Sequence, residues 1–292
     1  MSTIGFIGAG ITGTALATRL DQQGYNITAV SSRTLASAEK LAERMKHCQV
    51  YTTSQEVADN ADIIFITTPD DVIGEIAARI RWHKGQCIVH CSGAHSTDII
   101  EPAKEFGADT GCFHPLQTFA SIQQAIENLP GSTFAIEAQE PLLSILKGMS
   151  RAIGGYWVIL KAEDKVLYHT AAVFACNYLV TLTKLATDLW QDFGISQEQA
   201  IKALLPLLRG TLSNIENIGL PNCLTGPIAR GDLGTVKKHI EALEKENPHL
   251  LNTYKQLGLQ TLPIALAKGK INPGKTQELQ DILSKQKQGA LI

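Results

Sequence analysis

Cysteine pairs and clusters of metal ligands are missing from this sequence. Its six cysteines form no CxxC pair and show no metal-ligand spacing, so we expect no bound metal. An excess of one charge is also missing, because 26 lysines and arginines face 28 aspartates and glutamates, a net charge of −2. The sequence therefore predicts no surface for nucleic acid or for an anionic membrane. Internal repeats are lacking too.

Nothing that resembles a leader precedes the first expected strand, which begins at Thr3 and leaves no room for a signal or transit peptide. Together with the absence of paired cysteine motifs, this favours the reducing cytoplasm. Hydrophobic residues make up 44% of the chain, and 292 residues are enough for two domains and a large core. We therefore expect a cytoplasmic protein of two globular domains.

A glycine-rich turn near the N-terminus carries the strongest functional signal. Thr3–Ile7 is a short apolar run typical of a buried strand, and a GxGxxG pattern follows it and opens a helical pattern. Gly8 permits the tight turn, Gly10 lets a pyrophosphate approach the backbone, and Gly13 lets the helix pack on the strand. Free N–H groups at the helix N-terminus would hold the anion. The residues predicted to bind the dinucleotide are Gly8, Ala9, Gly10, Ile11, Thr12 and Gly13.

The end of the second expected strand, Asn26–Ser31, lacks the carboxylate that usually binds the ribose of NAD. Ser31, Ser32 and Arg33 stand there instead. No negative charge at this position opposes a 2′-phosphate, and the guanidinium of Arg33 can bind a phosphate bidentately. The sequence therefore favours NADP over NAD. The alternative is that Arg33 is a solvated residue that merely begins the helix Leu35–Lys46.

The expected strand Ala61–Thr67 ends in a loop whose backbone would face the cofactor. The strand is apolar nearly throughout, as buried parallel strands are. The helix Val72–Ile80 follows, with Asp70 or Asp71 as its cap. The loop residues predicted to bind the cofactor are Thr67, Thr68 and Pro69.

Two more polar residues, Ser92 and His114, follow the expected strands Gln86–Cys91 and Thr110–Phe113. Strands that alternate with helices imply a doubly wound parallel sheet, in which ligands bind outside the carboxyl ends of the strands. That rule places Thr67, Ser92 and His114 on one functional edge. A simple Ser-Gly turn and a structural histidine with satisfied hydrogen bonds are the alternatives for the last two residues.

Strands nearly disappear in the second half of the chain. We expect a doubly wound α/β Rossmann domain over residues 1–160, followed by an all-α domain over residues 161–292. The stretch Ala162–Phe193 holds no glycine or proline and is apolar nearly all round, so we expect a buried helix. Polar side chains such as His169 interrupt it, which disfavours a membrane span. Further helices are expected at Gln197–Ile218, Leu233–Glu246, His249–Leu257 and Gln260–Ala267.

The long helix predicts a homodimer. A helix that is apolar on all sides needs more cover than a domain of about 130 residues readily provides. A second subunit that packs on the helical domain would supply this cover. We therefore expect two copies of the chain to associate through their helical domains.

Two proton-carrying side chains lie one turn apart in the long helix. Lys165 and His169 share one face, and Asn177 flanks that face about 80° further round. A buried helix tolerates such residues poorly unless they pair or serve a site, so we predict that they line a substrate cleft. His169 is the candidate proton donor, because imidazole ordinarily titrates near neutrality. Lys165 would hold a substrate carboxylate or disfavour protonation of the histidine, Asn177 would orient the substrate, and Ser92 would close the site.

Four motifs give the chain a family resemblance, and this resemblance covers nearly the whole chain. They are His90–Ala94, Phe113–Phe119, Tyr168–Ala172 with Asn177, and Leu224–Pro227 with Arg230–Asp232. The architecture resembles the 6-phosphogluconate and β-hydroxyacid dehydrogenases, and it is similar to pyrroline-5-carboxylate reductase and to deazaflavin-dependent NADP reductases. The closer resemblance is to bacterial Rossmann-like NADP-binding oxidoreductases with a C-terminal helical domain of unknown function. It implies an NADP-dependent oxidoreductase, whose candidate substrate residues are His114, Thr225 and Arg230.

The chain departs from the β-hydroxyacid pattern at one position. The residue four places after Lys165 is His169, where that pattern has asparagine, and this disfavours a simple hydroxy-acid substrate. The leading hypothesis is reversible hydride transfer between NADP(H) and a small carbonyl, imine or hydroxy compound. The alternative is a non-catalytic sensor or scaffold that binds NADP(H) without turnover. A nucleotide-using transferase is disfavoured, because the sequence has no lysine motif for a phosphate.

Overall fold

All strands of the described chain lie in its N-terminal part, and helices alone follow them. The computed structural model describes residues 2–285 and separates the chain into two units, Met1–Tyr178 and Leu179–Ile292. The long helix therefore begins in the first unit. The expected domain boundary after residue 160, which follows the change from strands to helices, stays a prediction.

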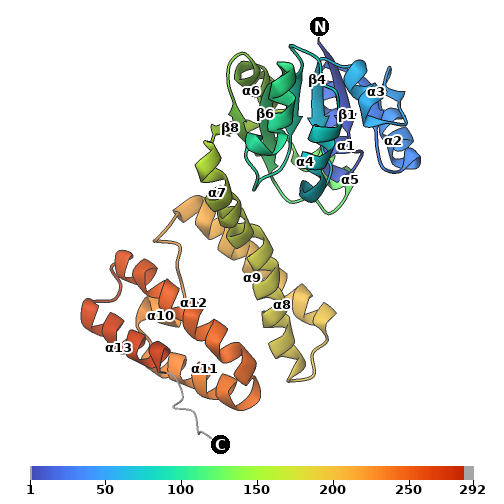
Figure 1. The fold of residues 1–292 in the computed structure, drawn as a ribbon. Helices are drawn as coiled ribbons and strands as arrows, with labels where there is room; N and C mark the ends of the chain where they lie inside the picture. The colour runs from blue at the N-terminus through green and yellow to red at the C-terminus, as the bar shows by residue number, and fades with distance from the viewer. Residues whose placement is uncertain (1, 286–292) are drawn as a thin grey trace, which may run out of the picture. The chain divides into compact units, whose positions relative to one another are not determined.

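The first unit is built on an eight-stranded sheet with the order β3-β2-β1-β4-β5-β6-β7-β8 (Figure 1). The Rossmann-type fold predicted from the sequence is thus confirmed. The strands are β1 (Thr3–Ile7), β2 (Asn26–Ser31), β3 (Gln49–Val50), β4 (Ile63–Ile66), β5 (Cys87–His90), β6 (Asp109–Leu116), β7 (Thr133–Ala138) and β8 (Tyr156–Ile159).

The sequence predicts a parallel sheet, but one pair of strands is antiparallel. Strands β1 to β6 pair in parallel, but β7 pairs antiparallel with β6, from Gly111 opposite Ala138 to Leu116 opposite Thr133. The chain leaves β6 and enters β7 on the same side of the sheet, where the strands β1, β2, β4, β5 and β6 end. Antiparallel neighbours can be joined there without a crossover connection. The carboxyl ends of these five strands still share one edge.

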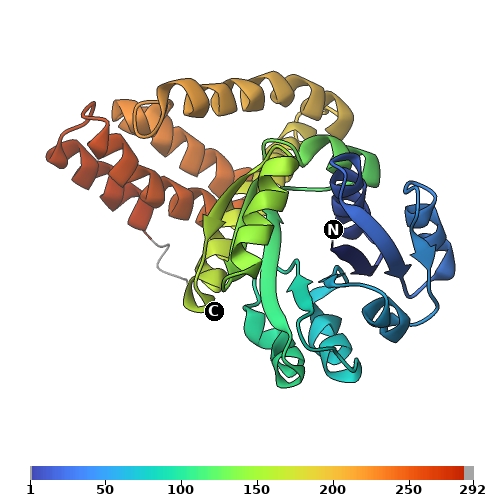
Figure 2. The same cartoon turned by 90° about the horizontal axis from the view of Figure 1, so that it is seen from above.

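Helices cover both faces of this sheet (Figures 1 and 2). One buried cluster joins a sheet face to α1, α2, α5 and α6, and a second joins the other face to α3, α4 and η1. Aromatic rings of β1, β4, β6 and β7 form a continuous row, in which Phe6 stacks on Phe65 and Phe113 on Phe134. The helical segments are α1 (Ile11–Gln22), α2 (Leu35–Ala42), α3 (Ser54–Asp59), α4 (Asp70–Arg79), η1 (Thr97–Phe106), α5 (Ile122–Asn128) and α6 (Leu142–Ala152).

The long helix differs from its prediction in two respects. It consists of η2 (Ala162–Asp164), α7 (Lys165–Ala172), a π-helical segment η3 (Val173–Asn177) and α8 (Tyr178–Gln191). It is also not buried by its own chain, because Leu167 is 75% exposed and Val180 is 69% exposed. The apolar pattern indicates that these side chains are buried against something, but it does not tell whether the same chain or another molecule buries them.

Among residues 2–285, one helix, Ala162–Gln191, has by its length and composition what a membrane crossing requires. One such helix is weak evidence of a membrane span, because the core helix of a soluble protein can have the same length and composition.

The second unit is all-α, as predicted. Its elements after α8 are α9 (Gln197–Ile218), α10 (Pro227–Arg230), α11 (Leu233–Glu246), α12 (Pro248–Ala267) and α13 (Pro273–Ser284). The sequence predicts two helices in place of α12 and none at α13. α12 continues through Gly258. Glycine is needed there because α13 packs close to it: a Cβ at this position would lie 2.8 Å from Leu283 of α13.

Candidate functional site

The turn between β1 and α1 has the geometry that the GxGxxG pattern predicts. Gly8 has a φ of +110°, and a Cβ on it would lie 2.8 Å from the backbone of Thr67. A Cβ on Gly13 would lie 2.6 Å from the carbonyl oxygen of Gly8, whereas Gly10 faces open space. Thr67 holds the turn by donating a 2.7 Å hydrogen bond to that same carbonyl of Gly8. The turn is therefore closely packed on one side and open at Gly10.

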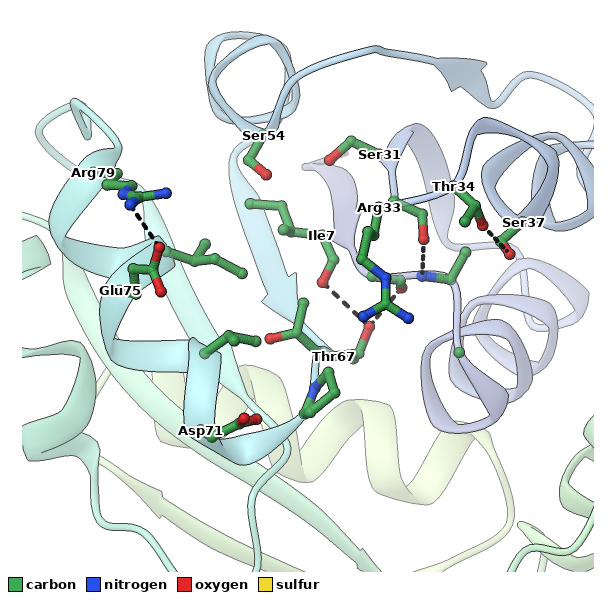
Figure 3. A pocket seen from close by; sticks show the side chains of 18 of the residues that line it. Ile7, Ser31, Arg33, Thr34, Ser37, Ser54, Thr67, Asp71, Glu75 and Arg79 are labelled. Atoms are coloured by element: carbon green, nitrogen blue, oxygen red, sulfur yellow. Dashed lines mark hydrogen bonds and ion pairs between the residues drawn. The ribbon is translucent and has the colours of Figure 1, made fainter.

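A cavity of about 760 Å³ opens beside this turn, and we name it the glycine-loop cavity (Figure 3). It brings together nine residues that the sequence predicts as cofactor ligands: Gly8, Ala9, Gly10, Ser31, Ser32, Arg33, Thr67, Thr68 and Pro69. The other three, Ile11, Thr12 and Gly13, lie in the first turn of α1. Lining residues that the sequence did not suggest include Thr34, Ser37, Thr52, Ser54, Asp71, Glu75 and Arg79.

Several donors in the glycine-loop cavity have no partner among residues 2–285. The hydroxyls of Ser31 and Thr68 are buried without a hydrogen bond, and no side chain caps α1 at Gly10. Arg33 lies before α2, which begins at Leu35, and its side chain reaches over the cavity that Ile7 and Thr67 line (Figure 3). The end of β2 therefore presents hydroxyls and a guanidinium to the cavity and no carboxylate.

A second group of polar residues lies at the ends of β5 and β6. It comprises Asp70, Ser92, Cys112, His114, Lys165, Tyr168 and His169, and we name it the lysine cluster. Lys165 is only 1% exposed, and its ammonium donates to the carbonyl of Ser92 at 3.1 Å and to the sulfur of Cys112 at 2.8 Å. The thiol of Cys112 donates to the same carbonyl at 3.3 Å. Burial raises the pKa of Cys112 to about 11 although Lys165 opposes the shift, so this thiol keeps its proton at neutral pH.

The two histidines of the lysine cluster meet over Gly93. Their ring centroids are 6.4 Å apart, and a Cβ on Gly93 would lie 2.8 Å from both rings, so only glycine fits between them. His114 Nδ1 is hydrogen-bonded to the Tyr168 hydroxyl at 2.8 Å. Burial, with the charges of Lys165 and His169, lowers the pKa of His114 to about 4. His114 is therefore neutral at pH 7.

His114 differs in position from its prediction. The sixth strand was expected to end at Phe113, just before His114, but β6 continues to Leu116, and His114 pairs within it opposite Ala135. The backbone of His114 is therefore fixed within a strand that pairs on both sides.

The hydroxyl of Ser92 is fully engaged within the protein. It donates to Asp70 at 2.6 Å and accepts from the backbone N–H groups of Ala94 and His95, at 3.3 and 3.1 Å. Asp70 is the first residue of α4 and caps no backbone group there, so its expected role as a helix cap is wrong. The sequence did not suggest this carboxylate as a site residue, because its partner Ser92 lies 22 residues further along the chain.

The remaining predicted residues lie elsewhere. Asn177 is exposed at the end of η3, and the π-helical turn changes its angular offset from His169. Thr225 and Arg230 belong to the second unit, where both line a different cavity. The structure thus brings together Ser92, His114, Lys165 and His169. Within the described residues no group of three or more histidine, cysteine, aspartate or glutamate side chains could hold a metal ion.

Two family models match this chain. Residues 3–93 match the model described as NADP oxidoreductase, coenzyme F420-dependent, and residues 132–261 match a domain of unknown function, DUF2520. A search of curated proteins found no match.

Solved structures share the fold over most of the chain. A candidate NADP oxidoreductase from Bacteroides fragilis is 26% identical, with a TM-score of 0.70 over 89% of this chain and 97% of that one. Protein TM1727 from Thermotoga maritima is 25% identical, with a TM-score of 0.75 over 91% and 99% of the two chains. Pyrroline-5-carboxylate reductase from Coxiella burnetii, 18% identical with a TM-score of 0.58 over 98% and 99%, shows likeness of fold alone. The chain thus combines an N-terminal Rossmann-like region that matches an NADP oxidoreductase model with a following region that matches a domain of unknown function, the combination that its motifs predict.

Proposed function

We propose that this chain is an NADP(H)-dependent oxidoreductase that reduces a small carbonyl or imine, and catalyses the reverse oxidation. One observation carries the proposal. Thr67, Thr68 and Pro69 line the glycine-loop cavity, and the next residue, Asp70, accepts the hydrogen bond of Ser92 in the lysine cluster. A dinucleotide site and a buried acid–base group therefore adjoin at the carboxyl edge of one sheet, where such folds bind their ligands.

The glycine-loop cavity would hold NADPH, which supplies a hydride when bound. The open backbone at Gly10 and the uncapped N-terminus of α1 suit the pyrophosphate. Ser31, Ser32 and Arg33 suit the 2′-phosphate, because they offer hydroxyls and a guanidinium where NAD sites carry an acid.

The lysine cluster would supply the proton that reduction consumes. Hydride addition to a carbonyl carbon leaves an oxygen that must be protonated, and reduction of an imine requires a protonated nitrogen. His114 is a poor donor because its lowered pKa keeps it neutral, and we assign the transfer to His169. Lys165 uses two of its three N–H groups within the protein, which leaves one for a substrate oxygen or carboxylate. Ser92 would position the turn that Lys165 contacts.

Substrate-dependent oxidation of NADPH tests this function. We expect turnover with at least one member of a panel of keto acids, cyclic imines and a deazaflavin, the last chosen because one matching model is named for coenzyme F420. NADPH binding must be measured on the same samples. Tight binding of NADPH without turnover of any compound would favour the alternative, a sensor or scaffold.

We infer that the protein is a cytoplasmic homodimer. All six cysteines are free thiols, which suits a reducing compartment. Large apolar side chains are exposed on α7, η3 and α8 of the long helix and on α9, among them Leu167, Phe174, Val180 and Leu207. A second copy would bury them, and light scattering at micromolar concentration should report twice the monomer mass of 31.6 kDa. A monomer under these conditions contradicts the inference.

A further inference from the structure

The helical unit has a cavity of its own that is lined by positive charge. This cavity, of about 410 Å³, lies between the loop before α10, α10 itself and the end of α12. Its volume is within the range of small-molecule sites. The lining residues are Leu224, Thr225, Gly226, Ala229, Arg230, Lys268 and Lys270, so the lining includes three cations and no acid.

Lys268 holds one wall of this cavity in place. Its ammonium donates to the carbonyl oxygens of Asn222 and Leu224, at 2.9 and 2.6 Å, and ties the end of α12 to the loop that precedes α10. The positive charge of Lys268 therefore stays at the cavity whatever occupies it. Its two partners are neutral carbonyl groups, and no carboxylate within residues 2–285 forms an ion pair with it.

The other polar groups of the cavity are not engaged within residues 2–285. Arg230 and Lys270 form none of the ion pairs of that part of the chain, and neither their side chains nor the hydroxyl of Thr225 has a hydrogen bond there. Of the exposed lysines elsewhere in this unit, Lys202 pairs with Glu198 at 2.8 Å, whereas Lys237 and Lys238 form no ion pair within residues 2–285. What distinguishes the three cations of the cavity is that they lie together in one lining that includes no acid.

The nearest candidate for neutralisation is Asp232, and it is otherwise engaged. Its carboxylate accepts from the backbone N–H of Thr235 at 3.0 Å and from the Thr235 hydroxyl at 2.7 Å, as the N-cap of α11. These bonds are the largest causes that lower the pKa of Asp232, and the charge of Arg230 contributes less. Asp232 thus stabilises a helix and leaves Arg230 available.

We propose that this cavity binds the phosphate or carboxylate group of a small molecule. A guanidinium offers two parallel N–H donors to such an oxyanion, an ammonium adds a point charge, and the Thr225 hydroxyl adds a neutral donor. A cleft lined by one sign of charge also attracts the opposite charge from solution. The site uses residues of the helical unit alone, so it does not depend on the proposed oxidoreductase function.

Calorimetric titration of the full-length chain tests the site, with inorganic phosphate and malonate as probes and with ionic strength held constant by chloride. Loss of a charge-assisted hydrogen bond costs about 1.5 kcal/mol, so Arg230→Gln and Lys270→Gln should each raise the Kd roughly tenfold. Arg209→Gln, on an exposed position of α9, is the matched control and should leave the Kd unchanged. The response to both probes tells which oxyanion the site prefers.

Phosphate could also enter the glycine-loop cavity, so Arg33→Gln is titrated in parallel. Binding that persists in Arg33→Gln and weakens in Arg230→Gln supports the helical site. Binding that weakens only in Arg33→Gln, or no binding of either probe, overturns it. Lys270 lies outside the helices, so Lys270→Gln carries the test if Arg230→Gln lowers the melting temperature.

Discussion

The glycine-loop cavity and the lysine cluster adjoin on one sheet, but their polar groups differ in burial and in hydrogen bonding. In the cavity, Arg33 and Asp71 are exposed, and buried hydroxyls such as that of Ser31 have no partner. In the cluster, Lys165 and Ser92 are buried, and each makes several hydrogen bonds to protein atoms. The first arrangement keeps donors free for a ligand, whereas the second fixes them in position. Substitutions in the cavity should therefore change binding, and those in the cluster should change both chemistry and stability.

The largest effect is expected in the cluster. His169→Gln should lower kcat about 10²–10⁴-fold, because it removes the proposed proton donor, and should leave the Kd for NADPH unchanged. His95→Gln, an exposed histidine three residues after Ser92, is the control. Measuring kcat and melting temperature on the same samples decides the role. A lower melting temperature with an unchanged kcat would mean that His169 is structural.

The next effect concerns the cavity alone. Arg33→Asp should weaken NADPH binding about 100-fold relative to NADH, because two charge-assisted hydrogen bonds of about 1.5 kcal/mol each are lost. Arg44→Asp, an exposed position outside the cavity, should bind both cofactors as the wild type does. Fluorescence titration of the two nucleotides gives the ratio. An unchanged preference in Arg33→Asp would remove this residue from the 2′-phosphate site.

Acid should lower the stability of the protein through the histidines near the lysine cluster, and not through the glycine-loop cavity. The pKa of His114 is lowered to about 4, chiefly by burial, so the unfolded chain binds a proton below pH 6.5 that the folded chain does not bind. Stability is therefore complete above pH 6.5 and falls as pH decreases, by about 1.4 kcal/mol per pH unit for this residue, or roughly 2 kcal/mol at pH 5. Burial also lowers the pKa of His90, to about 3, and this histidine adds to the same slope.

Urea unfolding of His114→Gln between pH 5 and pH 8 isolates the contribution of His114. The slope below pH 6.5 should be shallower by about 1.4 kcal/mol per unit, whereas any difference at pH 8 reports packing and the Tyr168 hydrogen bond. Parallel curves for wild type and variant would show that His114 titrates normally in the folded protein.

The sequence predicted what depends on neighbours along the chain. The glycine turn, the polar end of β2 and the shared face of Lys165 and His169 are local patterns, and the structure brings the corresponding residues together. The missed contacts are long-range: Cys112 lies 53 residues before its partner Lys165, and no periodicity marks it as other than a core residue. The fold shows the same division, because the antiparallel β7 depends on the path of the chain between strands.

The smallest effect tests the link between the two regions. Asp70 follows the cavity loop directly and holds Ser92, whose carbonyl in turn accepts from Lys165. Asp70→Ala should remove the hydrogen bond that fixes this turn and lower kcat about tenfold, since a hydrogen bond to a charged group is worth about 1.5 kcal/mol.

The chain offers a matched pair for this test. Asp71→Ala removes the neighbouring first-turn carboxylate of α4, which lines the glycine-loop cavity, so it should affect the KM for NADPH and leave kcat unchanged. Asp70→Asn keeps an acceptor for the Ser92 hydroxyl and should restore most of kcat. A merely structural aspartate would lower the melting temperature without this division between kcat and KM. Equal effects of Asp70→Ala and Asp71→Ala on both constants would show that the cavity and the cluster are not linked through Ser92.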